Sequence, residues 1–192
     1  MSRTIPEYFK YKIDENILKS LDPKKYTYEI GKVGLDGEKT KDRKYVKNTA
    51  TRKSKIKWIY DESILKNIKY IINYLNVQSL WNFKLTLLDN LQYTIYNVGD
   101  YYNWHRDDNP IYNKDKRKIS FSIGLNDPNE YEGGELDIEI HGPNIKGKRF
   151  ETIVLEKNEM ICFKSSLWHR VRPVTKGVRK SLVGWVRGPQ FV

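Results

Sequence analysis

A histidine and an aspartate two residues apart are the first side chains that could do chemistry. They are His105 and Asp107, in the stretch of residues 96–107 that reads YNVGDYYNWHRD. Alternate residues of a β-strand leave by the same face, so on a strand this imidazole and this carboxylate converge on one point in space. Both groups bind divalent transition metals. The spacing therefore predicts half of a metal site.

A third ligand must come from elsewhere, and the other histidines are His141 and His169. His169 lies in FKSSLWHRVRPV, whose alternation indicates a strand, whereas His141 opens HGPNIKGK, which is typical of a loop. We therefore favour His169. Two histidines and one carboxylate on one side of a metal, with the remaining positions open, describe the arrangement used by non-heme Fe(II) oxygenases.

Other interpretations of these residues are weaker. A chance His-x-Asp has a probability of roughly one in five in a chain of this composition, so the tripeptide alone proves little. H-R-D also opens the catalytic loop of protein kinases, but the required asparagine falls one residue late at Asn113, and no Gly-rich loop with a V-A-I-K strand is present. Asp108 competes with Asp107 for a metal, yet strand parity turns it away, and it precedes the turn-forming pair Asn109-Pro110.

The context of the pair carries a resemblance. The chain continues through a Gly-Gly-Glu-Leu motif to a strand ending in Trp168 and His169, and an arginine follows ten residues later. The ordered set closely resembles the Fe(II)- and 2-oxoglutarate-dependent dioxygenases of the prolyl 4-hydroxylase and PKHD-type hydroxylase group, over about residues 52–188. Its elements are Tyr96, Gly99, Tyr102, His105, Asp107, Gly133, Gly134, Glu135, Leu136, Trp168, His169 and Arg179.

The resemblance implies the cofactors and the metal ligands. His105, Asp107 and His169 would hold Fe(II), with 2-oxoglutarate as cosubstrate, O2 as oxidant and ascorbate as a candidate reductant. Fe(II) contributes +2, Asp107 −1 and 2-oxoglutarate −2, which leaves one negative charge inside the barrel. One buried arginine neutralises this charge, and Arg179 stands at the family's position.

Parity on the last strand supports this anchor. Arg179 and Ser181 share a face and can hold one carboxylate, whereas the rival Lys180 points to the other face. Tyr96 and Tyr102 match family tyrosines; Tyr96 is the stronger candidate for a cosubstrate contact, and core packing is the alternative for both. Trp185 could line the cosubstrate pocket. Gly124 stands where relatives often have a bulky residue, and the missing side chain is expected to reshape the pocket beside the cosubstrate.

Alternation and turn residues predict a mainly β fold. The resemblance implies a double-stranded β-helix, or jelly-roll barrel, over residues 91–187, with N-terminal support helices packed on one sheet. The predicted barrel strands are 91–98, 103–106, 118–125, 135–140, 151–156, 160–164, 168–173 and 178–186.

Residues 1–90 are predicted to support the barrel within a single domain of residues 1–192. The predicted helices are 13–21 and 62–76, the second with Asp61 as its N-cap, and the predicted strands are 26–33, 55–59 and 81–87. Residues 34–54 are rich in Gly, Lys, Asp, Thr and Asn and predict a mobile loop. By resemblance this loop is a candidate lid over the site, with an ordinary surface loop as the alternative.

Composition limits the setting and the partners. The net charge is +11, with ten basic and three acidic residues in 32–57, so a nucleic acid partner is considered but not favoured over a lysine-rich solvated surface. The lone Cys162 is expected in the core. Without a membrane span or signal peptide, a cytoplasmic protein is expected. The sequence does not indicate the oligomeric state.

The substrate is the least determined feature. A prolyl or similar residue in a protein or peptide is the first choice, because the motif spacing is closest to prolyl-hydroxylase-like enzymes. The alternatives are a free amino acid or other small metabolite, a methylated nucleic acid and, from another class, a jelly-roll binding module without turnover. Release of succinate and CO2 from 2-oxoglutarate separates the enzymes from the binding module.

Overall fold

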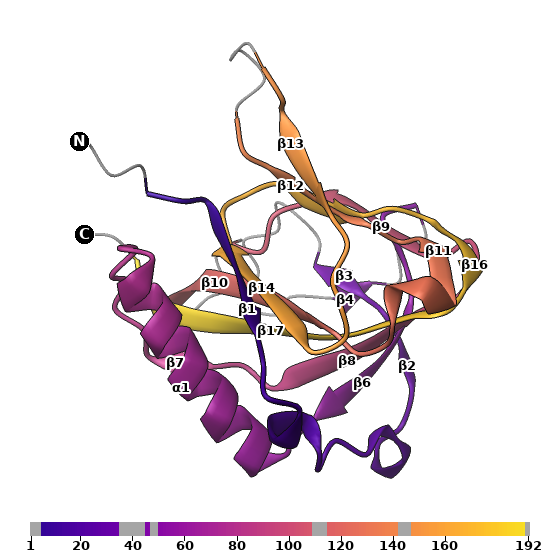
Figure 1. Ribbon diagram of the computed structural model, residues 1–192, viewed down its shortest axis with the longest axis horizontal. Helices are drawn as coiled ribbons and strands as arrows, with labels where there is room; N and C mark the ends of the chain where they lie inside the picture. Colours follow the sequence, from indigo (N-terminus) through magenta and orange to yellow (C-terminus); the bar gives the residue numbers. More distant parts are fainter. Residues whose placement is uncertain (1–4, 35–44, 47–49, 109–114, 142–146, 191–192) are drawn as a thin grey trace.

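A computed structural model describes residues 5–34, 45–46, 50–108, 115–141 and 147–190. Two antiparallel sheets face each other, with the smaller one above the larger one in Figure 1. Because its strands are antiparallel and cross between the two sheets, the chain forms the predicted double-stranded β-helix.

Within the described ranges, the larger sheet has eight strands. In spatial order they are β1 (Tyr8–Lys12), β14 (Glu159–Lys164), β10 (Asp115–Gly124), β17 (Arg179–Pro189), β8 (Leu91–Tyr96), β6 (Lys55–Ile59) and β2 (Glu29–Ile30), and β7 (Leu87–Leu88) pairs with β17.

The smaller sheet has five strands in the same ranges. Their order is β13 (Phe150–Ile153), β12 (Leu136–Glu139), β15 (His169–Val171), β9 (Tyr101–His105) and β5 (Arg52–Lys53). Two short ribbons pair β11 (Tyr131–Gly133) with β16 (Val174–Gly177) and β3 (Val33–Gly34) with β4 (Tyr45–Val46).

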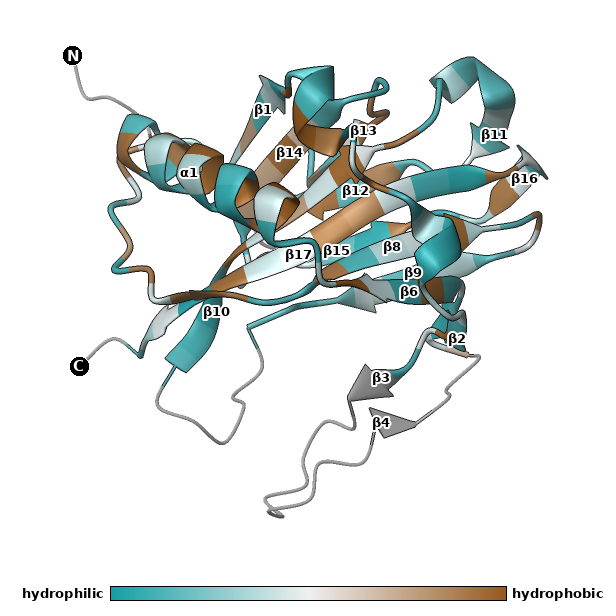
Figure 2. Ribbon diagram, turned by 90° about the horizontal axis from the view of Figure 1, so that it is seen from below, coloured by the Kyte–Doolittle hydropathy of each residue, from teal (hydrophilic) through white to brown (hydrophobic). Residues whose placement is uncertain are grey.

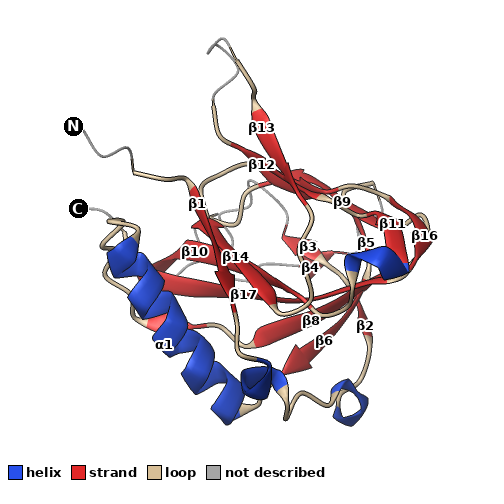
Figure 3. Cartoon of the chain, viewed as in Figure 1, coloured by secondary structure: helices blue, strands red, loops and turns tan. Residues whose placement is uncertain are grey.

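The helix α1 (Glu62–Gln78) lies against the larger sheet (Figures 1 and 3). The Asp61 carboxylate accepts a hydrogen bond from the backbone N–H of Ile64 and caps the first turn, as predicted. Figure 2 shows hydrophobic and hydrophilic residues alternating along the helix. Its apolar stripe is buried, namely Ile64, Ile68, Ile71, Ile72 and Leu75. No helix in the described residues is long and apolar enough to cross a membrane.

The two faces of the larger sheet differ in polarity. The face toward α1 is apolar, and Ile119, Phe121 and Ile123 of β10 join the helix in one core cluster. The alternate residues of the same strand, Ser120 and Ser122, face the space between the sheets and line a pocket there. Cys162 is buried in the core cluster, as predicted, and burial raises the pKa of its thiol.

All eight predicted barrel strands are present, with ends shifted by up to three residues. Several of the elements predicted in residues 1–90 are shorter in the structure or absent from it. The predicted helix 13–21 is only the 3-10 turn η1 (Glu15–Leu18), which starts after its N-cap Asp14. A second 3-10 turn, η2 (Pro23–Lys25), starts soon afterwards with Asp22 as its own N-cap, so the segment does not form one continuous helix. A further 3-10 turn, η3 (Pro128–Glu130), lies between β10 and β11.

The predicted strands 26–33 and 81–87 are wrong over most of their length. Only Glu29–Ile30 and the start of β3 are strand in the first, and only Leu87 in the second. Leu80 and Asn82 adopt positive φ angles of 59° and 49°, which turn the chain. The Asn76 side chain then hydrogen-bonds the backbone N–H and C=O of Phe83 in place of a neighbouring strand.

The predicted loop 34–54 is partly described. Tyr45–Val46 and Arg52–Lys53 are short strands, and Arg52 pairs with Tyr102 of β9, so the end of this stretch belongs to the smaller sheet. Residues 35–44 and 47–49, which carry most of the predicted lid, lie outside the described residues.

Burial of the α1 stripe should dominate the stability of this half of the fold. We expect Ile68→Ala to lower the free energy of unfolding by about 2–5 kcal/mol, since Ile68 is fully buried and leaves a cavity. Urea denaturation followed by circular dichroism measures the change. The control Tyr70→Ala, at a site that is 76% exposed on the same helix, should change stability by less than about 0.5 kcal/mol. Equal effects of the two substitutions would contradict this packing.

Candidate metal centre and pocket

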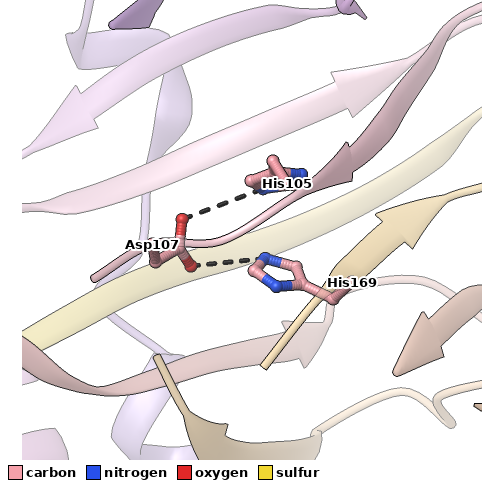
Figure 4. Close-up of side chains that lie close together, drawn as sticks. All are labelled: His105, Asp107 and His169. Carbon is pink, nitrogen blue, oxygen red and sulfur yellow. Dashed lines mark ion pairs between the residues drawn. The ribbon is translucent and has the colours of Figure 1, made fainter. Parts of the chain in front are cut away.

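The structure brings His105, Asp107 and His169 together. His169 on β15 stands directly opposite His105 on β9 in the antiparallel register. The Nε2 atom of His169 lies 3.3 Å from Oδ2 of Asp107, and Nε2 of His105 lies 3.8 Å from Oδ1 (Figure 4). One ligand atom from each residue falls within 4.8 Å of the others. The three side chains could therefore hold one metal ion.

Backbone carbonyls orient both imidazoles. Nδ1 of His105 lies 2.7 Å from the carbonyl oxygen of Asn103, and Nδ1 of His169 lies 3.0 Å from that of Leu167. A carbonyl can only accept, so each Nδ1 carries the proton and each Nε2 lone pair is directed to the cluster. Metal-binding histidines are held in the same way by hydrogen bonds from their second ring nitrogen.

Burial sets the protonation states of the cluster. Desolvation, followed by the nearby His169, lowers the pKa of His105 to about 3, so its imidazole is neutral at pH 7. Desolvation raises the pKa of Asp107, but its interactions with the adjacent His169 and His105 outweigh this effect, and the net pKa is lowered. A neutral imidazole and an ionised carboxylate are the forms that bind a metal.

Two serines support the carboxylate. The Ser120 hydroxyl donates a 2.7 Å hydrogen bond to Oδ2 of Asp107, and its oxygen lies 2.9 Å from that of Ser165. Ser165 also accepts the backbone N–H of Asp107 through its carbonyl, at 2.9 Å. Sequence reasoning did not identify either serine. The alternation that places Ile119 and Phe121 in the core was the available signal, because it turns Ser120 inward.

A pocket between the sheets opens from this cluster and contains the predicted anchor. The side chain of Arg179 is buried, and its Nη1 donates to the Ser181 hydroxyl at 3.2 Å, so the two residues face one space as parity predicted. The guanidinium lies 5.4 Å from the Tyr96 ring, and Tyr96 also lines the pocket. A Cβ on Gly134, which has φ +69°, would come within 2.8 Å of Cδ of Arg179, so this glycine leaves room for the arginine.

The other candidates also have defined places. Tyr102 lines the pocket and stacks on His105, with 3.5 Å between ring centroids, so its packing role is clear. Trp185 lines the pocket as well, and Arg117 lies 3.9 Å above its ring. Lys180 instead lines a separate hollow beside η1, and the exposed His141 is not part of the cluster.

The glycine at position 124 has a different explanation from the predicted one. Gly124 does not line the pocket. A Cβ there would meet the carbonyl oxygen of Glu156 at 2.4 Å, because the chain after β13 crosses close to the end of β10. The glycine therefore permits a close backbone approach and does not reshape the cosubstrate wall.

Two pocket residues were missed by sequence reasoning. The buried Arg52 donates from Nη2 to the Gln92 amide oxygen at 2.7 Å, and both side chains line the pocket. Gln92 could have been identified from its parity with Thr94 and Tyr96. Arg52 gave no comparable signal, because β5 is two residues long and lies in a polar stretch.

The donor set fits the expected group. Two imidazoles and one carboxylate with converging lone pairs match the facial arrangement of non-heme iron, and a buried arginine, which can bind a carboxylate, lines the same pocket. A metal site of this kind within a jelly-roll barrel defines an iron-dependent oxygenase class.

Comparison with known proteins agrees with this class. The profile of the 2OG-Fe(II) oxygenase superfamily matches residues 91–187, and the chain belongs to this superfamily. Membership implies Fe(II), 2-oxoglutarate and O2 as cofactors. A PKHD-type hydroxylase of Synechococcus sp. (strain CC9902) is 39% identical over 89 residues, which are 46% of this chain and 37% of the relative. One of Idiomarina loihiensis is 39% identical over 92 residues, 48% of this chain and 39% of the relative.

Solved structures share the fold. A Pseudomonas putida prolyl-4-hydroxylase aligns with a TM-score of 0.65 at 17% identity and covers 96% of this chain and 94% of its own. The viral collagen prolyl hydroxylase of Paramecium Bursaria Chlorella virus-1, solved with 2OG, aligns with a TM-score of 0.65 at 20% identity. The alignment covers 95% of this chain and 97% of the viral enzyme's chain. The chain thus aligns over nearly the full length of these two structures, although it spans only about two fifths of the length of the curated relatives that it matches.

The three converging side chains should control metal affinity. We expect His105→Ala, Asp107→Ala and His169→Ala each to weaken Mn(II) binding by more than roughly 100-fold, because loss of an outer partner alone costs up to about that much. Isothermal titration calorimetry measures the affinity. His141→Ala removes the remaining histidine of the chain from an exposed position and serves as the control. Wild-type affinity in any of the three variants would rule out that ligand.

The Ser120 hydrogen bond should tune the same affinity. We expect Ser120→Ala to weaken Mn(II) binding by roughly 10- to 100-fold, since Asp107 loses a 2.7 Å donor that orients its carboxylate. Ser122→Ala, two residues along the same inward face, is the matched control for Mn(II) affinity. An equal loss in both variants would show that general perturbation of β10, rather than this hydrogen bond, is responsible.

Proposed function

We propose that this chain is a 2-oxoglutarate-dependent dioxygenase that hydroxylates an unactivated C–H bond and releases succinate and CO2. The observation that carries the proposal is the buried convergence of His105, Asp107 and His169 in the same pocket as Arg179. A non-catalytic binding module would not need an open-sided metal centre joined to a carboxylate anchor.

Each pocket residue has a role in this proposal. His105, Asp107 and His169 hold the iron, which supplies oxygen activation when bound. Arg179 and the Ser181 hydroxyl hold the distal carboxylate of 2-oxoglutarate, and Tyr96 packs beside them. Tyr102 and Trp185 form apolar walls that exclude water, and the Ser120 hydroxyl keeps Asp107 in position.

The proposed substrate is a prolyl or similar residue in a protein or peptide. The PKHD-type relatives and the prolyl hydroxylase folds support this class. A Trichoplax adhaerens prolyl hydroxylase, solved with a peptide fragment of hypoxia inducible factor, is 25% identical and aligns with a TM-score of 0.57 over 73% of this chain and 66% of its own. Hydroxylation of a free amino acid is the second candidate, because a second buried arginine lines the pocket.

Succinate formation tests the activity. Purified chain with Fe(II), ascorbate, 2-oxoglutarate and O2 should release succinate, and a peptide or free-proline substrate should gain 16 daltons by mass spectrometry. His105→Ala and Asp107→Ala should abolish both signals, because each removes a proposed ligand of the iron. Iron-independent succinate release, or none from the wild type with any substrate of the panel, would contradict the proposed reaction.

Arg179 should set the requirement for 2-oxoglutarate. We expect Arg179→Ala to raise the half-saturating concentration of 2-oxoglutarate by at least about 30-fold, equivalent to ~2 kcal/mol for one lost partner of a buried charge pair. Succinate release at varied 2-oxoglutarate measures this. Lys180→Ala, adjacent but facing the other side of the sheet, is the control. A larger effect in the lysine variant would transfer the anchor to Lys180.

A further inference from the structure

The pocket contains a second arginine whose position differs from that of the proposed cosubstrate anchor. Arg52 is 5% exposed and lies at the smaller sheet's edge, paired with Tyr102. Its guanidinium carbon is 4.7 Å from the centre of the Tyr102 ring, and that ring stacks on His105. A positive charge therefore lies one aromatic ring away from a proposed metal ligand.

Arg52 has no carboxylate partner among the described residues. Its guanidinium donates from Nε to the Ser54 hydroxyl at 2.8 Å and from Nη2 to Gln92, which uses two of its five N–H donors. Arg117 and Arg187, in contrast, share a carboxylate partner, because both pair with Asp89. A buried charge without an opposite charge costs several kcal/mol, so an anion that enters the pocket would be bound favourably by Arg52.

The cofactors do not provide this anion. Fe(II) at +2, Asp107 at −1, 2-oxoglutarate at −2 and Arg179 at +1 sum to zero. Arg52 then adds an uncompensated +1 within the same pocket. The remaining ligand of the reaction is the substrate, so charge balance favours a substrate that carries one negative charge close to the oxidised carbon.

A second buried donor belongs to another residue that lines this pocket. Trp185 lines the pocket, and its Nε1 is buried without a hydrogen-bond partner among the described residues. Trp185 and Arg52 are linked through two residues. The centroid of the Trp185 ring lies 6.5 Å from that of Trp58, Trp58 pairs with Gln92 in the β6–β8 register, and Gln92 accepts the hydrogen bond from Arg52. Arg52 therefore lines the pocket beside a tryptophan whose indole ring is mainly apolar and whose N–H is still unpaired among the described residues.

We propose that the substrate carries a carboxylate that pairs with Arg52 beside Tyr102 while its C–H bond faces the metal centre. This inference rests on the proposed function and narrows its substrate class. The carboxylate belongs either to a free amino acid or C-terminal residue, or to an acidic side chain next to the oxidised residue. A neutral internal prolyl segment would leave the Arg52 charge unpaired.

Matched acid and amide probes test the proposal without turnover. The full chain is loaded with Mn(II) and saturating 2-oxoglutarate under anaerobic conditions, and binding is measured by calorimetry. One arm compares N-acetyl-L-proline with its amide, and the other compares the capped dipeptide amides Ac-Pro-Asp and Ac-Pro-Asn. The wild type should bind the acid of at least one pair roughly 10-fold more tightly or better, as expected for a charge-assisted hydrogen bond. The arm that discriminates identifies the source of the carboxylate.

Arg52→Gln should remove this preference, and Arg52→Lys should restore part of it because the charge returns without the planar fork. Arg149→Gln is the control, since it removes the same charge from an exposed side chain directly before β13, at the other edge of the smaller sheet. No preference for the acid in either arm, a preference that survives Arg52→Gln, or an effect of Arg52→Gln confined to 2-oxoglutarate affinity would overturn the proposal. Failure of the wild type to form succinate would instead contradict the proposed function, so the two failures are distinguishable.

Discussion

The antiparallel pairing of β9 with β15 is the constraint on which the site depends. It places His169 opposite His105, although the two residues are 64 positions apart in the chain. Side chains alternate along a strand, so a slip of one residue would send His169 to the outer face of the sheet and separate it from Asp107. Pairing of β15 with β12 on its other edge holds this register from both sides.

The two faces of the larger sheet explain how a polar pocket survives inside a stable fold. Apolar residues on one face pack against α1 and provide the hydrophobic stabilisation, which leaves the alternate positions free to be polar. On β17 these positions are Arg179 and Ser181, both buried. Buried charges of this kind are expensive without partners, so the metal and the carboxylates that bind there should also stabilise the fold.

Periodicity predicted what depends on local pattern. The barrel strands, the α1 stripe and the inward direction of Arg179 all follow from spacings within one segment. The pairing partners of a strand do not, because register is a long-range property. Arg52 illustrates the limit: its strand has two residues, and its place in the pocket depends on contacts with Gln92 and Tyr102, 40 and 50 positions later. The wrong strand at 81–87 has a similar cause, since the Asn76 side chain bonds the Phe83 backbone.

The two pocket arginines reach the pocket from different sheets and contact different residues of β8. Arg179 stands opposite Tyr96 in the β17–β8 register, whereas Arg52 comes from β5 of the smaller sheet and is bonded to Gln92, four residues away along β8. Four residues of strand span roughly 13 Å of backbone, so the two arginines are held at separate points of the same inward row. If Arg179 binds the cosubstrate, as proposed, this arrangement leaves Arg52 with its own contacts to Gln92 and Ser54 and with a charge that a different acid can pair.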